Sequence, residues 1–340
     1  TTGIALIGSG IFAREEHLPA IRAASSTLAL KAIYSRSIAS ARALASDAAD
    51  VELYSEDQEG RGYEALLQRS DVLGVVIALP ILVQPEYIKK ALSAGKHVLA
   101  EKPIAKDVAT ARELLEWYKT NISGPTFGIA ENFRFFPSFH YAAEQLAQMG
   151  RFLGFRMRVQ SLVQPGGKYF ETAWRKKPEY QGGFLLDGGV HFLAATRLAL
   201  GGAGVKPVKT SAFSGQLQEH LPPVDTLNAT VQLSNGASGT INMSFGTTFS
   251  GSEYAFAAEK GTVTVSRGKV TILRDGKEEV KEFPEEGNGV KQEFAAWGQA
   301  LSAGKPDPRQ SAEEALRDLQ LLEAMLQSGE KGGAPVELDL

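Results

Sequence analysis

The chain has 340 residues, 43% hydrophobic and 22% charged, which is enough for two globular domains with sizeable cores. Its 36 basic and 39 acidic residues nearly cancel, to a formal charge of -3, which argues against a surface dedicated to nucleic acid or to anionic membrane. The absence of cysteine excludes disulfides, thiolate metal ligands and cysteine nucleophiles. No apolar run reaches the roughly 18–20 residues that cross a bilayer, and no leader pattern opens the chain, so we expect a cytoplasmic protein.

In the first third of the chain, short apolar runs alternate with helical patterns. The predicted strands are residues 2–7, 28–34, 51–54, 73–79, 96–101 and 126–130, and the predicted helices are residues 16–24, 37–48, 84–94 and 107–119. Near-continuous apolar strands that alternate with helices are typical of a parallel sheet covered on both faces. We therefore predict an α/β Rossmann domain, a doubly wound parallel sheet, over residues 1–124.

From about residue 150 the pattern changes to closely spaced strands, separated by turn sequences such as Ser234-Asn235-Gly236. The predicted strands are residues 152–163, 227–233, 239–245, 254–258, 261–265 and 269–273, and helical patterns cover residues 183–200, 290–301 and 312–326. We predict an α+β domain over residues 125–340, with a largely antiparallel open sheet. Dimerisation of two copies through the open face is an expectation that the sequence does not establish.

A glycine-rich turn follows the first predicted strand, with the sequence Gly8-Ser9-Gly10-Ile11-Phe12-Ala13. In this G-x-G-x-x-A pattern the first glycine permits a tight turn, the second lets backbone approach a pyrophosphate, and the small third residue lets helix pack on strand. Glycines are common in ordinary turns, but this one stands between a strand and a helix at the start of a βαβ pattern. We predict that it binds a dinucleotide.

The end of the second strand indicates which dinucleotide is bound. An NAD site normally has an acidic residue there for the ribose 2′-hydroxyl, whereas an NADP site has arginine and small donors. This chain has Tyr34-Ser35-Arg36-Ser37, without an acid. Arg36 would pair with the 2′-phosphate while Ser35 and Ser37 donate hydrogen bonds; the alternative is an exposed arginine that merely begins a helix. We predict NADP(H).

Two further segments, Leu79-Pro80 and Glu101-Lys102-Pro103, lie at the carboxyl ends of predicted parallel strands. Open α/β sheets bind ligands at that edge. Because the residue before a proline is held extended, Lys102 is expected to project from the strand end instead of entering a helix.

Asp187 and His191 lie in the segment Gly182-Gly183-Phe184-Leu185-Leu186-Asp187-Gly188-Gly189-Val190-His191, four residues apart, so a helix would place them on one face. A histidine titrates near neutral pH and suits the transfer of a hydroxyl proton, while a lysine ammonium would stabilise an alkoxide. Asp187 would orient the imidazole or bind a substrate hydroxyl; alternatively, it caps the helix and His191 fills the core. The remaining histidines show no convincing metal spacing, so no metal is expected.

These paired motifs resemble the Gfo/Idh/MocA oxidoreductase family, which includes glucose–fructose oxidoreductase and inositol dehydrogenase. The resemblance extends over nearly the whole chain, from the glycine turn through Ala94-Gly95-Lys96-His97-Val98 and Glu101-Lys102-Pro103 to the Asp187–His191 segment. It is nearest to a fungal NADP(H)-linked branch with Gly10-Ile11-Phe12-Ala13-Arg14 and Trp174-Arg175 blocks.

The resemblance implies that Lys102 lies beside nicotinamide and substrate, and that His191 is the acid/base with Lys102 and Asp187 as partners. The proton donor remains open between Lys102 and His191. It also implies that Trp174 and Arg175 contact cofactor or substrate. Asn132 and Arg134, in the block Ala130-Glu131-Asn132-Phe133-Arg134, are further candidates for hydrogen bonds to a polyol or carboxylate.

The sequence therefore predicts an NADP(H)-dependent oxidoreductase that acts on a hydroxyl or carbonyl carbon of a sugar, polyol or other small carbonyl compound. A non-catalytic dinucleotide sensor and a nicotinamide-assisted glycosidase are the alternatives. Retention of Lys102, Asp187 and His191 together favours the enzyme over the sensor. Neither the substrate nor the physiological direction follows from the sequence.

Overall fold

The computed structural model describes residues 1–46 and 50–340, which form two compact units. Unit 1 comprises Thr1–Asn132 and Gly289–Leu316, and unit 2 comprises Phe133–Asn288 and Arg317–Leu340. This division differs from the predicted one at residue 124, because the sixth strand stays with unit 1 and the chain returns to unit 1 after residue 288. Within the described residues, no helix has the length and apolar character needed to cross a membrane.

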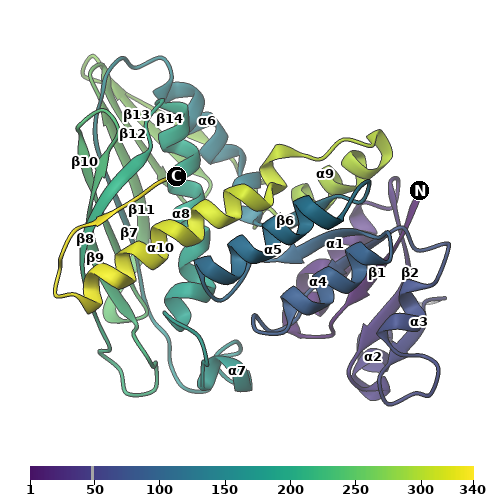
Figure 1. Cartoon of the computed structure of the whole chain (residues 1–340). Helices are drawn as coiled ribbons and strands as arrows, with labels where there is room; N and C mark the ends of the chain where they lie inside the picture. Colours follow the sequence, from purple (N-terminus) through teal and green to yellow (C-terminus); the bar gives the residue numbers. More distant parts are fainter. Residues whose placement is uncertain (47–49) are drawn as a thin grey trace. The chain divides into compact units, whose positions relative to one another are not determined.

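Unit 1 is built on a six-stranded parallel sheet in the order β3-β2-β1-β4-β5-β6, which confirms the predicted Rossmann architecture (Figure 1). Its strands are β1 (Thr2–Ile7), β2 (Leu28–Ser35), β3 (Glu52–Ser55), β4 (Gly74–Ile77), β5 (His97–Glu101) and β6 (Phe127–Ala130). The central strands are buried on both faces, as their continuous apolar sequence predicts. The strand order reverses between β1 and β4, the point at which sheets of this kind bind ligands.

The helical segments of unit 1 largely follow the predicted pattern. They are η1 (Ala13–His17), α1 (Leu18–Ala23), α2 (Ile38–Ala45), α3 (Tyr63–Leu67), α4 (Gln84–Ser93), α5 (Val108–Asn121), α9 (Val290–Ala303) and η3 (Pro308–Gln310). Asp107 caps α5 as predicted, because its carboxylate accepts the Thr110 N–H at 2.8 Å. The helix predicted over residues 37–48 corresponds to α2, and the last predicted residues, 47 and 48, lie outside the described part of the chain.

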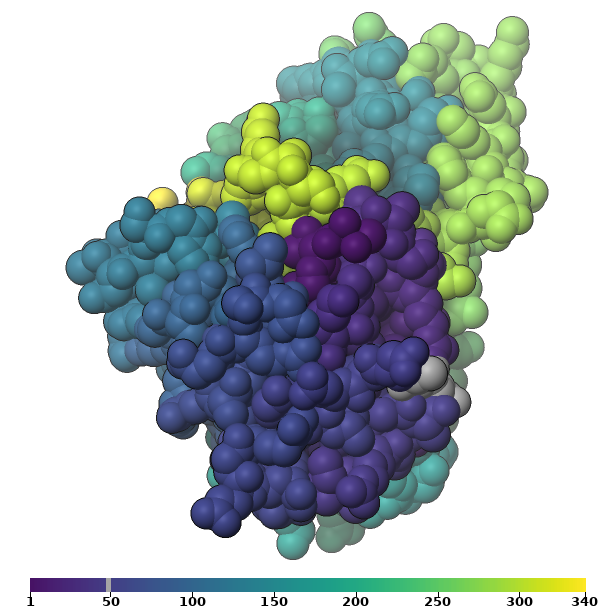
Figure 2. All heavy atoms as spheres, turned by 90° about the vertical axis from the view of Figure 1, so that its right-hand side faces the viewer, coloured from purple at the N-terminus to yellow at the C-terminus, as the bar shows by residue number. Residues whose placement is uncertain are grey.

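Helix α9 joins unit 1 although it follows the second domain in sequence. Phe294 and Trp297 of α9 are buried in the same apolar cluster as Ile4 and Leu6 of β1. In Figure 2, yellow-green residues near position 300 lie directly beside the purple N-terminal residues. A sequence pattern identifies the helix, but not the sheet on which it packs.

Unit 2 contains a nine-stranded sheet in the order β14-β13-β12-β11-β7-β10-β9-β8-β15. The strands are β7 (Phe152–Leu162), β8 (Pro207–Gly215), β9 (Thr226–Leu233), β10 (Ser238–Ser244), β11 (Gly246–Ala258), β12 (Gly261–Ser266), β13 (Lys269–Arg274), β14 (Lys277–Glu282) and β15 (Val336–Glu337). All strand pairs are antiparallel except β7 with β10, so the predicted largely antiparallel sheet is confirmed.

Helices cover one face of this sheet (Figure 1). The helical segments of unit 2 are η2 (Asn132–Phe135), whose first residue belongs to unit 1, α6 (Pro137–Leu146), α7 (Ala173–Lys176), α8 (Phe184–Gly202) and α10 (Ala312–Glu330), which enters unit 2 at Arg317. The opposite face is polar: Thr240 of β10 pairs with Arg156 and Thr230, and Asn242 pairs with Asn228. An antiparallel sheet with one solvated face has this alternation.

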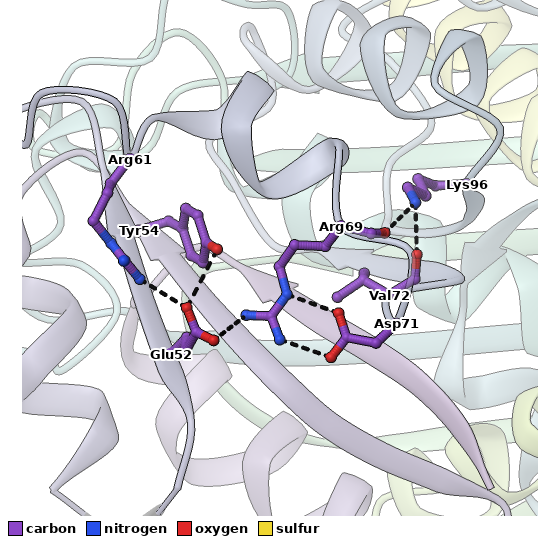
Figure 3. A network of polar contacts seen from close by, with 7 residues as sticks. All are labelled: Glu52, Tyr54, Arg61, Arg69, Asp71, Val72 and Lys96. Atoms are coloured by element: carbon purple, nitrogen blue, oxygen red, sulfur yellow. Dashed lines mark hydrogen bonds and ion pairs between the residues drawn. The ribbon is translucent and has the colours of Figure 1, made fainter.

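A network of paired charges occupies the amino ends of the strands of unit 1 (Figure 3). The Arg69 guanidinium donates to both carboxylate oxygens of Asp71, at 2.9 and 2.7 Å, and pairs with Glu52 at 3.3 Å. The buried Lys96 ammonium donates to the backbone carbonyls of Arg69 and Val72, at 2.7 Å each. Because these residues begin or precede β3, β4 and β5, the network lies at the sheet edge opposite to the one predicted to bind ligand.

Candidate active site

The glycine turn after β1 has different constraints at its two glycines. Gly8 has a φ of +113°, and a Cβ there would lie 2.2 Å from the Ala78 carbonyl oxygen, so only glycine fits. Gly10 faces open space, with no described heavy atom beyond its own neighbours within 4 Å of a Cβ placed there. A tight first glycine and an open second glycine match the requirements of a turn that binds a pyrophosphate. Ala13 is buried at the helix–strand contact, as its small size allows.

The end of β2 lies beside this turn. The hydroxyl oxygens of Ser9 and Ser35 are 2.8 Å apart, so the structure brings together two of the predicted cofactor-binding residues. Arg36 is exposed, and Ser37 caps α2 by accepting the Ser40 N–H at 3.2 Å. The helix N-terminus and an exposed arginine therefore occur together at the position predicted for a 2′-phosphate.

An acidic residue that the sequence analysis missed also reaches this helix end. Asp57, two residues after β3, accepts the Ile38 N–H with both carboxylate oxygens, at 2.9 and 3.2 Å. Its position is set by the pairing of β2 with β3, which places the two carboxyl ends side by side. An acid two residues after β3 was the available signal, but only the sheet order shows which helix it reaches.

The carboxyl ends of β4 and β5 are joined by one buried amide. Gln84, at the start of α4 and 1% exposed, accepts the Leu79 N–H at 3.2 Å and donates to the Glu101 carbonyl at 2.8 Å. The structure therefore brings the two predicted segments, Leu79-Pro80 and Glu101-Lys102, against the same side chain. The sequence alone does not single out Gln84, because a glutamine at the start of a helix is not a sign of a binding site.

The Glu101 side chain is held in place by two further contacts. Its Oε1 lies 2.7 Å from His17 Nε2, and its Oε2 accepts the Lys102 backbone N–H at 3.2 Å. His17 is fully buried at the end of η1, a π-helical turn, and packs against the rings of Phe12 and Phe294. Turns of this kind occur often at functional sites. These contacts hold the Glu101 side chain and the backbone of Lys102 in place at the end of β5.

Two more acidic residues lie in the interior at this edge of unit 1. Glu131, directly after β6, and Glu293 of α9 are each 1% exposed. Burial raises the pKa of Glu293 well above 4.5, and the negative charges of Glu101 and Glu131 raise it further. Burial and these neighbours therefore favour the neutral, protonated form of Glu293. Among residues 1–46 and 50–340, no group of three or more acidic or histidine side chains is arranged to hold a metal ion.

In unit 2, α8 presents Asp187 and His191 on one face, as their spacing predicts. Arg175 donates from Nε to Asp187 Oδ2 at 2.7 Å, and its guanidinium carbon lies 4.1 Å from the centre of the Trp174 ring. Asp187 is 9% exposed and is not the residue that caps α8, which is Gly183. The predicted Trp174-Arg175 block thus meets the predicted catalytic aspartate, a contact that their separation in sequence did not indicate.

The two remaining candidates differ in their surroundings. Arg134 is 5% exposed and donates to both carboxylate oxygens of Asp318, at 2.8 and 2.6 Å, while Arg197 binds the same carboxylate at 2.7 Å. This ion pair gives Arg134 a structural role between η2 and α10, and its contact with substrate stays a prediction. Asn132 is buried at the end of unit 1 and stays a predicted substrate residue.

Comparison with family models covers most of the chain. Residues 2–122 match an oxidoreductase family described by its NAD-binding Rossmann fold, and residues 149–338 match the C-terminal alpha/beta domain of the same family. The chain belongs to the Gfo/Idh/MocA oxidoreductase family. It is accordingly an oxidoreductase of CH–OH or C=O groups with a nicotinamide-dinucleotide domain, and the glycine turn and the Ser9–Ser35 contact fit that cofactor.

Relatives of this Gfo/Idh/MocA oxidoreductase align along its full length. Dehydrogenase FPY6 of Fusarium mangiferae is 47% identical, over 98% of this chain and 97% of its own. The uncharacterised protein YMR315W of Saccharomyces cerevisiae is 32% identical, over 99% and 98% of the two chains. A crystal structure of an oxidoreductase from Thermotoga maritima is 32% identical, covers 99% of this chain and 98% of its own, and has a TM-score of 0.88.

Proposed function

We propose that this protein transfers hydride reversibly between NADP(H) and a hydroxyl or carbonyl carbon of a small sugar, polyol or other carbonyl compound. The observation that carries the proposal is the convergence on Glu101, where Gln84 and His17 hold the residue directly before Lys102. Two more distant relatives support it. D-xylose 1-dehydrogenase (NADP(+)) 2 of Haloferax volcanii is 26% identical, and a 3-ketoreductase of Actinomadura kijaniata, 25% identical, was crystallised with NADP.

The bound nicotinamide supplies or accepts the hydride, and the protein manages the charge and the proton on the substrate oxygen. We assign to the Lys102 ammonium the stabilisation of negative charge on that oxygen. We assign to His191 the exchange of the proton with that oxygen, because an imidazole ring can both donate and accept a proton. Asp187, whose carboxylate is held by Arg175, binds a substrate hydroxyl or orients His191.

The preference for NADP rests on Arg36, which is exposed beside the N-terminus of α2. A guanidinium pairs strongly with a phosphate, whereas a ribose hydroxyl gains much less from it. Asp57 acts in the opposite direction, since its carboxylate already accepts the Ile38 N–H at the same helix end. Arg36 and Asp57 should therefore set the cofactor preference together.

Steady-state kinetics with both cofactors tests this assignment. Arg36→Ala should raise KM for NADPH by at least about tenfold and leave KM for NADH nearly unchanged, because only NADPH carries the 2′-phosphate. Asp57→Asn should lower KM for NADPH and leave KM for NADH nearly unchanged, since the amide removes a negative charge. Equal effects on both cofactors in either variant would refute the NADP assignment.

The reaction is tested by an absorbance screen of carbonyl compounds, sugars and polyols with NADPH and NADP⁺. Lys102→Ala should lower kcat by at least about a hundredfold while NADPH binding, followed by fluorescence, stays measurable. Net consumption of NADPH that requires a carbonyl substrate distinguishes this function from a dinucleotide sensor and from a glycosidase that recycles its cofactor. Failure of every carbonyl and alcohol to change NADPH absorbance would overturn the proposal.

The location and assembly of the protein stay predictions. A cytoplasmic location stays an expectation from the sequence, with which the absence of cysteine is compatible. A homodimer through the open face of the unit 2 sheet would have a polar interface, since Arg156, Thr230 and Thr240 face outward there. Sedimentation equilibrium of the wild-type protein measures the assembly directly, and a single monomeric mass would exclude the dimer.

A further inference from the structure

Aromatic rings lie on and beside the stretch of α8 that carries Asp187 and His191, the two residues to which the proposed function assigns the chemistry. Phe184, Asp187, Gly188, His191 and Phe192 follow one another at helical spacings, so they share one face of α8. Between Phe184 and Phe192, the other residues of this face are phenylalanine and glycine.

The rings on and around this face form a continuous series of contacts. Phe133 stacks on the His191 imidazole, with ring centres 4.8 Å apart and planes 19° apart. Phe192 lies 5.8 Å from Phe133 and 6.3 Å from Phe245, and Phe245 lies 5.9 Å from Phe184. All four phenylalanines are partly exposed, unlike the buried aromatic residues of the core.

Gly188 makes room for one of these rings. A Cβ at Gly188 would lie 2.9 Å from Cζ of Phe245, so a larger residue at this position would displace the ring. The Phe245 ring therefore lies directly over the helix between Asp187 and His191. The apolar surface around the pair depends on this specific contact.

We propose that the substrate carries a flat apolar ring next to its reacting carbonyl, as in an aryl ketone or aryl aldehyde. This inference rests on the proposed function and narrows its substrate class. Partly exposed aromatic rings stabilise a ligand ring by stacking and by removal of apolar area from water. A polyol instead needs several polar groups that converge on its hydroxyls, because each buried hydroxyl without a partner is costly.

The reaction remains a two-electron reduction. The carbonyl carbon gains the hydride of NADPH, the carbonyl oxygen gains a proton, and the products are an alcohol and NADP⁺. The ring itself is not altered. Its contribution is to hold the carbonyl against the polar pair, which increases the fraction of bound substrate in a reactive orientation.

A matched pair of diones tests the inference with the full-length protein. The kcat/KM for NADPH-dependent reduction of 1-phenylpropane-1,2-dione should exceed that of butane-2,3-dione by at least about tenfold. Phe192→Leu should reduce this ratio severalfold, since it removes one ring from the wall, and Phe184→Leu should act in the same direction. Phe213→Leu is the control, because Phe213 lies on β8, is 68% exposed and is remote in sequence from α8.

The outcomes separate this inference from the proposed function. Equal kcat/KM for the two diones, or a clear preference for an aldose over both, would overturn the ring preference and leave hydride transfer standing. A ratio that neither phenylalanine variant changes would also overturn it, provided that circular dichroism shows both variants folded. No NADPH oxidation with any carbonyl compound would instead overturn the proposed function itself.

Discussion

The charged side chains at the two edges of the unit 1 sheet differ in their exposure to solvent. At the amino edge, Arg69 lies between Asp71 and Glu52, and the two acids are 49% and 54% exposed, so opposite charges meet at the surface. At the carboxyl edge, Glu131 and Glu293 are each 1% exposed and share the interior with Glu101 and His17. His17 and Glu101 form a close pair there, with His17 Nε2 2.7 Å from Glu101 Oε1.

The difference indicates what each edge is selected for. Surface pairs cost little and contribute little, typically below about 1 kcal/mol each. Buried acids cost several kcal/mol unless they are paired, hydrogen-bonded or protonated. We propose that the cluster is retained because it supports the strand end that carries Lys102. Changes at the carboxyl edge should therefore alter turnover, whereas changes at the amino edge should alter stability alone.

Of the substitutions that test the difference between the two edges, one at His17 should have the largest effect, on kcat. His17→Leu removes the donor that holds Glu101 Oε1, so we expect kcat to fall about a hundredfold with little change in KM for NADPH. His17→Gln places an amide N–H near the position of Nε2 and should restore part of kcat. We regard His17 as a positioning residue, and the pH profile of kcat/KM should change in the leucine variant.

Stopped-flow and steady-state assays of both variants give the result. If His17→Leu keeps wild-type kcat, or if the glutamine variant is as slow as the leucine variant, His17 does not position Lys102. Urea unfolding of both variants shows whether a loss of kcat merely follows a loss of fold.

The next effect is expected at the amino edge, on stability. Lys96→Met leaves the carbonyls of Arg69 and Val72 without their buried donor and should lower the free energy of unfolding by about 1–3 kcal/mol. The value of kcat should not change. Lys305→Met, at an exposed position of the same unit, is the matched control. A fall in kcat in folded Lys96→Met would contradict the division between the edges.

The Rossmann architecture was predictable from sequence because buried parallel strands have continuous apolar sequences. Lys102 and Arg36 were candidates because they follow the carboxyl ends of such strands. The contacts that organise those ends were not predictable. Gln84 and His17 lie far from Glu101 in sequence, and only the sheet order and the π-helical turn bring them to it. Arg134 also shows what the sequence left out, because its ion pair with Asp318 joins residues 184 positions apart.

A smaller, pH-dependent effect should come from Glu293. Its raised folded pKa means that the native state holds a proton that the unfolded chain releases above about pH 4.5, so stability should fall as pH rises above that value. Glu101 and Glu131 are the charged groups that raise this pKa, after burial. Glu293→Gln is neutral at every pH and should lose this part of the dependence.

Urea unfolding of wild type and Glu293→Gln at pH 5.5 and pH 8 measures it. The stability of the variant relative to wild type should be greater at pH 8 than at pH 5.5. Parallel pH dependences for the two proteins would show that Glu293 is not the group that holds the proton.

The smallest effect should come from Asp71→Asn, which removes the carboxylate charge that pairs with the Arg69 guanidinium at the amino edge. Asp71 is 49% exposed, so the loss in free energy of unfolding should be about 1 kcal/mol or less and should shrink at high salt. Arg69 keeps Glu52 as a partner at 3.3 Å, which limits the loss further. The free energy of unfolding of wild type and Asp71→Asn in low and high salt, together with kcat, tests this prediction. A loss well above 1 kcal/mol would show that the Asp71 charge stabilises unit 1 more than an exposed ion pair is expected to. Any loss of kcat would show that the amino edge also affects turnover.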